Sequence, residues 1–233
     1  MSSNNIKLSL FLCLSMCLGI GILRFSYTAL LPSTREAFDW SVGFASLLGS
    51  ANLLGYLMGA FAAMRLPQNK SMTLYIQIAA IAGMFSLMCC AFANFPQAWY
   101  IFWRVISGIS GGLLMILSPS VVAQCCDIQD RFKINFIGFS GIGLGVLLAT
   151  LFLPYLDQIS IQTAWLILCG FALMICVCLS ILLQQFKHHL SVQTIVTTSK
   201  VKLNTLFYSL LVVYACSAFA YIPHSLFWID YLS

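Results

Sequence analysis

The chain has 233 residues, of which 61% are hydrophobic and only 7% are charged. Soluble globular proteins carry about 25% charged residues, so this composition excludes a water-soluble fold and predicts an all-α protein that crosses the membrane several times. The net charge of +5 is a guide to membrane topology and not to nucleic-acid binding, because the chain has no basic face.

A helix of about 20 apolar residues crosses the hydrocarbon core of a bilayer. By that measure the sequence predicts seven transmembrane helices, over residues 8–31, 42–64, 72–94, 97–123, 134–154, 162–184 and 205–229. The first is too long for a signal peptide and lacks a small-residue cleavage site. We therefore expect a six-helix bundle over residues 1–184, a basic linker over 185–204 and a seventh helix within 205–233.

The loops between these helices differ in charge. If the amino terminus is cytoplasmic, the outer loops contain only Arg35, and the inner segments contain eight basic residues: Lys7, Arg65, Lys70, Arg131, Lys133, Lys187, Lys200 and Lys202. The positive-inside rule then predicts a cytoplasmic amino terminus and an outer carboxy terminus.

Cysteine and histidine do not form a recognisable metal or redox motif. The ten cysteines include no CxxC pair and lie within or near apolar segments, where they serve as small apolar side chains. His188 and His189 are adjacent but have no third ligand nearby, so we expect solvated loop residues. The sequence thus predicts no catalytic residue, no metal and no cofactor, which disfavours a membrane enzyme.

Two arginines lie inside predicted helices. Arg24 is on the first helix and Arg104 on the fourth, and neither has a carboxylate within one helical turn. A charge at the centre of a membrane helix costs about 3 kcal/mol. At 1.5 Å per residue, Arg24 lies roughly 24 Å from the inner edge and Arg104 roughly 10 Å from the outer edge, so both fall in the outer half of the membrane.

Two interpretations of these arginines remain open. Either they line a polar pathway or binding site, or each reaches the interface or ties down a neighbouring backbone carbonyl. All six acidic residues lie in loops or at helix ends. An anionic substrate group or a solvated cavity is therefore the simplest partner for the two cations.

Glycines four residues apart recur on three of the predicted helices. Such spacing allows close helix contacts in lipid. The pattern predicts helix packing at Gly55, Gly59, Gly108, Gly112, Gly138, Gly141 and Gly145. The third and sixth helices have few glycine pairs and no central charge, so we expect them at the periphery.

Several of these motifs resemble a known family. They are RVISGISGG at Arg104–Gly112, the glycine-rich run Gly138–Gly145, and GILRFSYTALLP at Gly21–Pro32. Their order resembles the major facilitator superfamily, in particular its uncharacterised bacterial YbfB/YjiJ-type branch. The resemblance implies a bacterial inner-membrane protein that carries a small solute by alternating access around a site near the midplane of the bilayer.

The candidate residues for the substrate cavity are Arg24 and Tyr27 on the first helix, Asn52 on the second and Arg104 on the fourth. We expect Arg24 and Arg104 to bind an anionic group or set the electrostatic field, and Tyr27 and Asn52 to orient the substrate.

Two features depart from the superfamily pattern. The stretch Gly59–Lys70 has no acidic residue, and the seven predicted helices compare with twelve in the superfamily. We therefore expect an incomplete transporter that pairs in the bilayer with a complementary half or a second copy. The alternative is a non-transporting remnant of a transporter gene.

Overall fold

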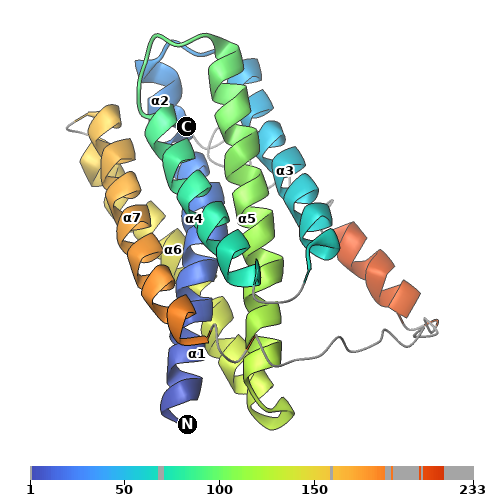
Figure 1. The fold of residues 1–233 in the computed structure, drawn as a ribbon. Coiled ribbons are helices and arrows are strands. Elements are labelled where there is room, and N and C mark those ends of the chain that lie inside the picture. The colour runs from blue at the N-terminus through green and yellow to red at the C-terminus, as the bar shows by residue number, and fades with distance from the viewer. Residues whose placement is uncertain are drawn as a thin grey trace. The chain divides into compact units, whose positions relative to one another are not determined.

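The computed structural model describes residues 2–67, 71–157, 160–186, 190, 205 and 207–217. The first membrane helix consists of three continuous segments, α1 (Ser3–Met16), the π-helix η1 (Cys17–Phe25) and α2 (Ser26–Ala37). It is followed by α3 (Val42–Arg65), α4 (Ser71–Cys90), α5 (Gln97–Cys125), α6 (Ile128–Asp157) and α7 (Ile161–Phe186) (Figure 1). These described elements confirm the predicted all-α membrane fold.

Within this described part, six helices are long and apolar enough to cross a membrane. A shorter apolar helix, Phe207–Ser217, falls within the predicted seventh span, and residues 218–229 of that span lie outside the described residues. The chain divides into two units, Met1–Val192 and Gln193–Ser233. Most of the predicted linker 185–204 also lies outside the described residues.

Two predicted carboxy-terminal helix ends are wrong by four residues or more, and the first and fifth helices also begin before the predicted residues 8 and 134, at Ser3 and Ile128. The first helix does not stop at residue 31 but continues through Pro32 to Ala37. Proline removes one backbone hydrogen bond, but membrane helices tolerate it where neighbouring helices pack around the site. Here the hydroxyl of buried Thr34 accepts a hydrogen bond from the Trp165 indole of α7 at 3.2 Å, which holds the helix beyond the proline in place.

The third helix ends at Cys90 and not at residue 94. Asn94 has a φ of 70°, in the left-handed region that asparagine tolerates better than most residues. The helix therefore ends at Cys90, and the chain turns at Asn94, the predicted last residue of the span.

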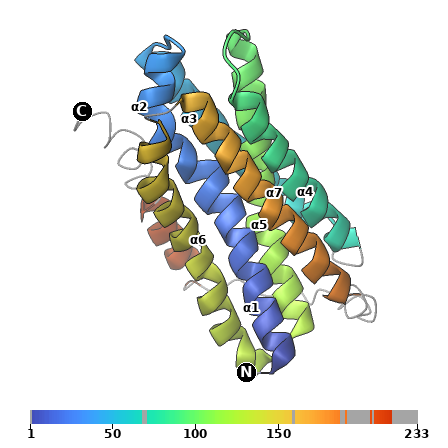
Figure 2. The same cartoon turned by 90° about the vertical axis from the view of Figure 1, so that its left-hand side faces the viewer.

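The first helix forms the centre of the bundle in unit Met1–Val192. It has the most buried apolar stretch of the six spans. Figure 2 shows α1 with α6 on one side and α7 on the other. α5 packs against both α3 and α4, and α7 packs against α4. Consequently a side chain on the first helix can reach α5 and α6 directly.

Exposure differs from the expectation for the third helix, α4, and agrees with it for the sixth helix, α7, whose apolar stretch is 33% buried. The apolar stretch of α4 is 50% buried, whereas those of α3 and α6 are 39% and 28% buried. The glycines of α3 and α6 that contact another helix lie on one face of each helix, and the remaining faces expose large apolar side chains such as Leu54, Phe61, Phe132 and Phe136. A glycine pair thus marks one packed face and says nothing about the opposite one.

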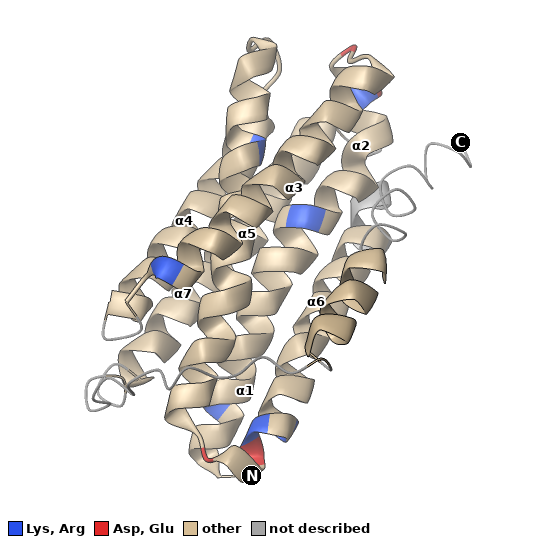
Figure 3. Cartoon of the chain, turned by 90° about the vertical axis from the view of Figure 1, so that its right-hand side faces the viewer, with Lys and Arg blue, Asp and Glu red and all other residues tan. Residues whose placement is uncertain are grey.

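Charged residues lie mainly toward the two ends of the bundle. Figure 3 shows only isolated blue bands on the tan helices between those ends. At the end that contains the amino terminus, Asn5 of α1 donates a hydrogen bond to Asp130 of α6 at 2.7 Å, and Arg131 donates to the carbonyl of Ala123 on α5. These contacts link the ends of three helices.

Glycines bring the backbones of α3 and α5 into contact. A Cβ atom on any of four glycines would collide with a carbonyl of the opposite helix: Gly55 with Val105, Gly59 with Ile109, Gly108 with Asn52 and Gly112 with Tyr56. Because backbone atoms cannot move aside as a flexible side chain can, this interface has no room for a larger residue.

Glycines on α6 pack in a similar way against the first helix. A Cβ atom on Gly141 would meet the carbonyl of Cys13, one on Gly145 would lie 2.6 Å from the Cα of Gly21, and one on Gly138 would meet the Leu12 side chain. The first helix therefore lies directly against the α6 backbone at two points.

Gly108 and Gly143 provide a matched test of this packing. We expect Gly108→Ala to lower the free energy of unfolding by about 1–3 kcal/mol, because the added methyl group overpacks a backbone contact. Gly143→Ala is the control, since nothing lies within 4 Å of its Cβ position. The melting temperature of each variant in detergent is measured from the fraction of protein that stays monodisperse after heating. Equal melting temperatures for the two variants would contradict the packing argument.

Candidate functional site

Arg104 is the only charged side chain that is buried in the part of the chain described, with 2% of its surface exposed. Its Nη1 atom lies 3.5 Å from the carbonyl oxygen of Leu23, and its Cζ atom lies 4.0 Å from the centre of the Tyr27 ring. A carbonyl dipole and an aromatic face both stabilise a cation in a low-dielectric environment. These contacts tie α5 to the first helix.

Tyr27 and Asn52 extend the contacts of Arg104 to α3. The Tyr27 hydroxyl donates to the carbonyl of Ala45 at 2.8 Å, and the Asn52 amide donates to the carbonyl of Arg104 at 3.2 Å. Both side chains are buried. Three of the four predicted site residues therefore lie in one polar network that joins the first helix, α3 and α5.

Arg24, the fourth predicted residue, lies in a different environment. It is half-buried, and its Cζ atom lies 5.5 Å from the centre of the Phe25 ring and 5.9 Å from that of Tyr56. No described residue accepts a hydrogen bond from its guanidinium. The two arginines thus have no contact in common among the described residues.

The π-helix η1 carries Arg24 into this position. In a π-helix each carbonyl bonds to the N–H five residues later, and such segments occur frequently at functional sites. At the end of η1, the N–H of Ser26 donates to the carbonyl of Ile22, as in an α-helix. The next carbonyl, that of Leu23, accepts from Arg104 and also from the Ser107 hydroxyl at 3.1 Å. α5 therefore holds the first helix where its winding changes, one residue before Arg24.

Sequence reasoning did not identify Tyr56 or Ser107. Tyr56 lies one helical turn after Asn52 on α3, and Ser107 lies three residues after Arg104 on α5. A search for polar residues at helical spacing from the candidates would have found both, because residues three and four apart share a helix face.

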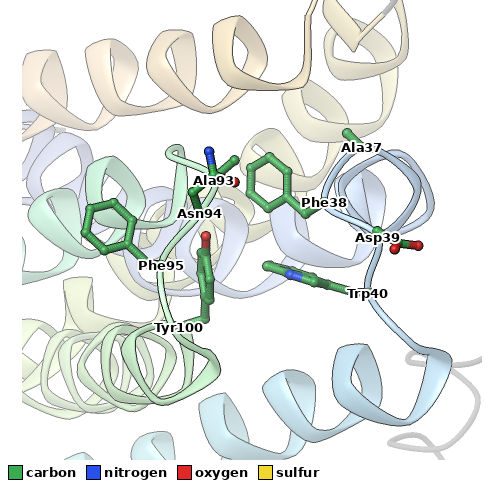
Figure 4. A pocket seen from close by; sticks show the side chains of 8 residues that line it. All are labelled: Ala37, Phe38, Asp39, Trp40, Ala93, Asn94, Phe95 and Tyr100. Carbon is green, nitrogen blue, oxygen red and sulfur yellow. The ribbon is translucent and has the colours of Figure 1, made fainter.

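An aromatic hollow between two loops was also not predicted. It has a volume of about 320 Å³ and is lined by Ala37, Phe38, Asp39, Trp40, Ala93, Asn94, Phe95 and Tyr100 (Figure 4). The Trp40 and Tyr100 rings lie 4.8 Å apart, and the Tyr100 hydroxyl donates to the carbonyl of Phe92 at 2.7 Å. The signal in the sequence was the concentration of aromatic residues at predicted helix ends, where membrane proteins place their aromatic belts.

Comparison with known families identifies the family of this chain. The model of the family described as "Uncharacterised MFS-type transporter YbfB" matches residues 16–233, nearly the whole chain. The chain belongs to this family of the major facilitator superfamily. This confirms the family resemblance seen in the motifs of the first, fourth and fifth helices. The protein is accordingly a multi-pass membrane protein of a transporter family.

Solved structures support the same fold. The proton:xylose symporter XylE bound to 6-bromo-6-deoxy-D-glucose matches with a TM-score of 0.64 and 18% identity, over 80% of this chain and 45% of that one. A D-xylose-proton symporter matches with a TM-score of 0.63 and 18% identity, over 94% of this chain and 53% of that one. The YbfB-family chain thus spans about half the length of the transporters it resembles. No curated protein matches its sequence.

Two substitutions at Tyr27 distinguish the contribution of its ring to stability from that of its hydroxyl. Tyr27→Phe keeps the ring beside Arg104 and loses the bond to Ala45, so we expect a loss of about 1 kcal/mol in stability. Tyr27→Leu also removes the aromatic face from a desolvated cation, which adds about 2 kcal/mol. Melting temperatures in detergent measure both effects, and a Phe variant as unstable as the Leu variant would show that the ring contributes nothing.

Proposed function

We propose that this protein is a secondary transporter of a small organic anion that works by alternating access. The family match carries the proposal, because it covers residues 16–233 and the family is one of transporters. The likeness to two solved symporters supports the fold that such a mechanism requires. Alternating access in this superfamily moves two six-helix bodies around a site near the midplane of the bilayer.

The proposed substrate site lies where the first helix, α3 and α5 meet, with half-buried Arg24 toward the solute and buried Tyr27, Asn52 and Arg104 in the wall behind it. Two arginines near this junction favour an anionic solute over a neutral one. Every acidic residue in the part described lies in a loop or near a helix end, so none of them neutralises these cations from within the bundle. The buried network of Tyr27, Asn52 and Arg104 supports a rigid wall for the site.

A second six-helix body is part of this proposal. It is supported by the length of the solved transporters, which are about twice as long as this chain. A complementary half or a second copy of this chain fills that position. The non-transporting alternative predicts no uptake with either partner.

We also propose that the end of the bundle with Lys7, Arg65 and Lys133 faces the cytoplasm of a bacterial inner membrane. The aromatic hollow at Trp40 then lies on the outer side.

Reporter fusions test the orientation. A fusion that ends at Asn94 should give active alkaline phosphatase, which folds only outside the cytoplasm. A fusion that ends at His188 should give fluorescent green fluorescent protein, which folds inside. The same reporter active at both positions would contradict the proposed topology.

An uptake assay tests the transport proposal. We expect cells or vesicles that contain the protein with its second body to take up labelled benzoate, a small organic anion, and not D-xylose, a neutral sugar. We expect the Arg24→Leu substitution to abolish the uptake of benzoate. The variant should still insert, because it removes a charge that costs about 3 kcal/mol in the bilayer. Lys7→Gln is the control, since it removes an exposed cation at the far end of the bundle.

Benzoate uptake that survives Arg24→Leu would contradict the site assignment. Uptake by a detergent-characterised monomer of this chain alone would contradict the need for a second body. Absence of uptake with either partner would favour the non-transporting alternative.

A further inference from the structure

The two intramembrane arginines differ in whether their guanidinium N–H groups are accessible to a solute. One face of Arg104 is covered by the Tyr27 ring, and one nitrogen faces the carbonyl of Leu23. Its Nε atom has no hydrogen-bond partner among the described residues and is sealed from solvent. Arg104 is therefore enclosed by protein, and a solute does not reach it in this conformation.

Arg24 has the opposite character. The centres of the Phe25 and Tyr56 rings lie 5.5 Å and 5.9 Å from its Cζ atom, and the group makes no hydrogen bond to a described residue. No residue that the structure describes therefore occupies its N–H donors. Those donors form a planar fork that matches the two oxygens of a carboxylate. A half-buried cation with free donors is suited to a ligand, whereas an enclosed one is suited to holding the fold.

Arg104 and Ser107 also act on Arg24 through the backbone. Both side chains contact the Leu23 carbonyl, which belongs to the residue immediately before Arg24. Leu23 and Arg24 are the two residues before Phe25, the last residue of the π-helix, where the chain returns to α-helical winding. Anchoring this carbonyl fixes the direction in which the next side chain leaves the helix.

We propose that Arg24 contacts the anionic group of the solute and that Arg104 is a positioning residue that fixes the turn carrying Arg24. The inference rests on the proposed transport function and names its substrate class. The two rings beside Arg24 favour a monocarboxylate attached to a flat apolar group, because such a solute pairs its charge with the guanidinium and its apolar body with Phe25 and Tyr56.

Arginine-specific labelling with phenylglyoxal tests the first part on the unmodified full chain in lipid nanodiscs. We expect Arg24 to be modified about tenfold faster than Arg104, because an enclosed group reacts only through local opening. Benzoate should slow the modification of Arg24, and benzamide, its neutral analogue of similar shape, should not. Peptide mass spectrometry measures the two rates separately.

Three results would overturn this assignment: equal labelling rates of the two arginines, no protection by benzoate, or equal protection by benzamide. The labelling readout does not require transport. Protection without uptake would reject the transport function and keep the Arg24 site, whereas uptake without protection would reject the Arg24 assignment and keep transport.

A pair of serine variants on α5 tests the positioning role. Ser107→Ala removes one donor to the Leu23 carbonyl, so we expect the benzoate concentration for half-protection of Arg24 to rise about two- to tenfold. Ser120→Ala is the matched control, because its hydroxyl donates to the Ile116 carbonyl of its own helix at 2.8 Å.

Melting temperatures of both variants separate a change in position from a loss of fold. A shift in half-protection for Ser107→Ala at an unchanged melting temperature supports the positioning role. An unchanged half-protection, or an equal shift in the Ser120→Ala control, would overturn it.

Discussion

The burial of one permanent cation constrains the arrangement of this bundle. Arg104 lies inside the protein with 2% of its surface exposed, in a chain that crosses a medium of low dielectric. Such a group is tolerated only where dipoles or charges surround it. Here the Leu23 carbonyl and the Tyr27 ring provide that environment, and both belong to the first helix. The position of the first helix beside α5 and the stability of the buried charge therefore depend on each other.

Close backbone packing makes these polar contacts possible. Lipid provides no hydrophobic force between helices, so association depends on van der Waals contact and on hydrogen bonds between helices. The glycines of α3 and α5 bring the two backbones together, and at that short distance the amide of Asn52 reaches the carbonyl of Arg104. The same short distance between the first helix and α6 holds the π-helix against Gly145. The polar network therefore depends on the close packing of the helices that carry it.

In the proposed function, one cation contacts the solute and the other stays within the fold. Arg104 is enclosed by the fold, and Arg24 lies near the end of the π-helix with the Phe25 and Tyr56 rings close to its guanidinium. A preorganised donor needs less reordering when a ligand arrives, which favours both affinity and selectivity. The matched symporters are described with sugars, which are neutral, and a half-buried arginine with free donors is a feature that would favour a different class of solute.

The sequence alone was sufficient to predict the membrane class, the six described spans and the family, because these depend on composition, on helix length and on motifs within short stretches. It also identified Arg24 and Arg104 as unusual, since a charge in an apolar run is visible without a structure. Only the tertiary structure showed that Arg104 is enclosed while Arg24 is half-exposed, because the difference depends on Leu23, about eighty residues before Arg104 in the chain. The π-helix and the passage of the first helix through Pro32 were also decided by packing, against α5 and α6 in one case and against Trp165 in the other. Local sequence sets which residues prefer a helix, but contacts between distant segments decide how that helix winds and where it ends.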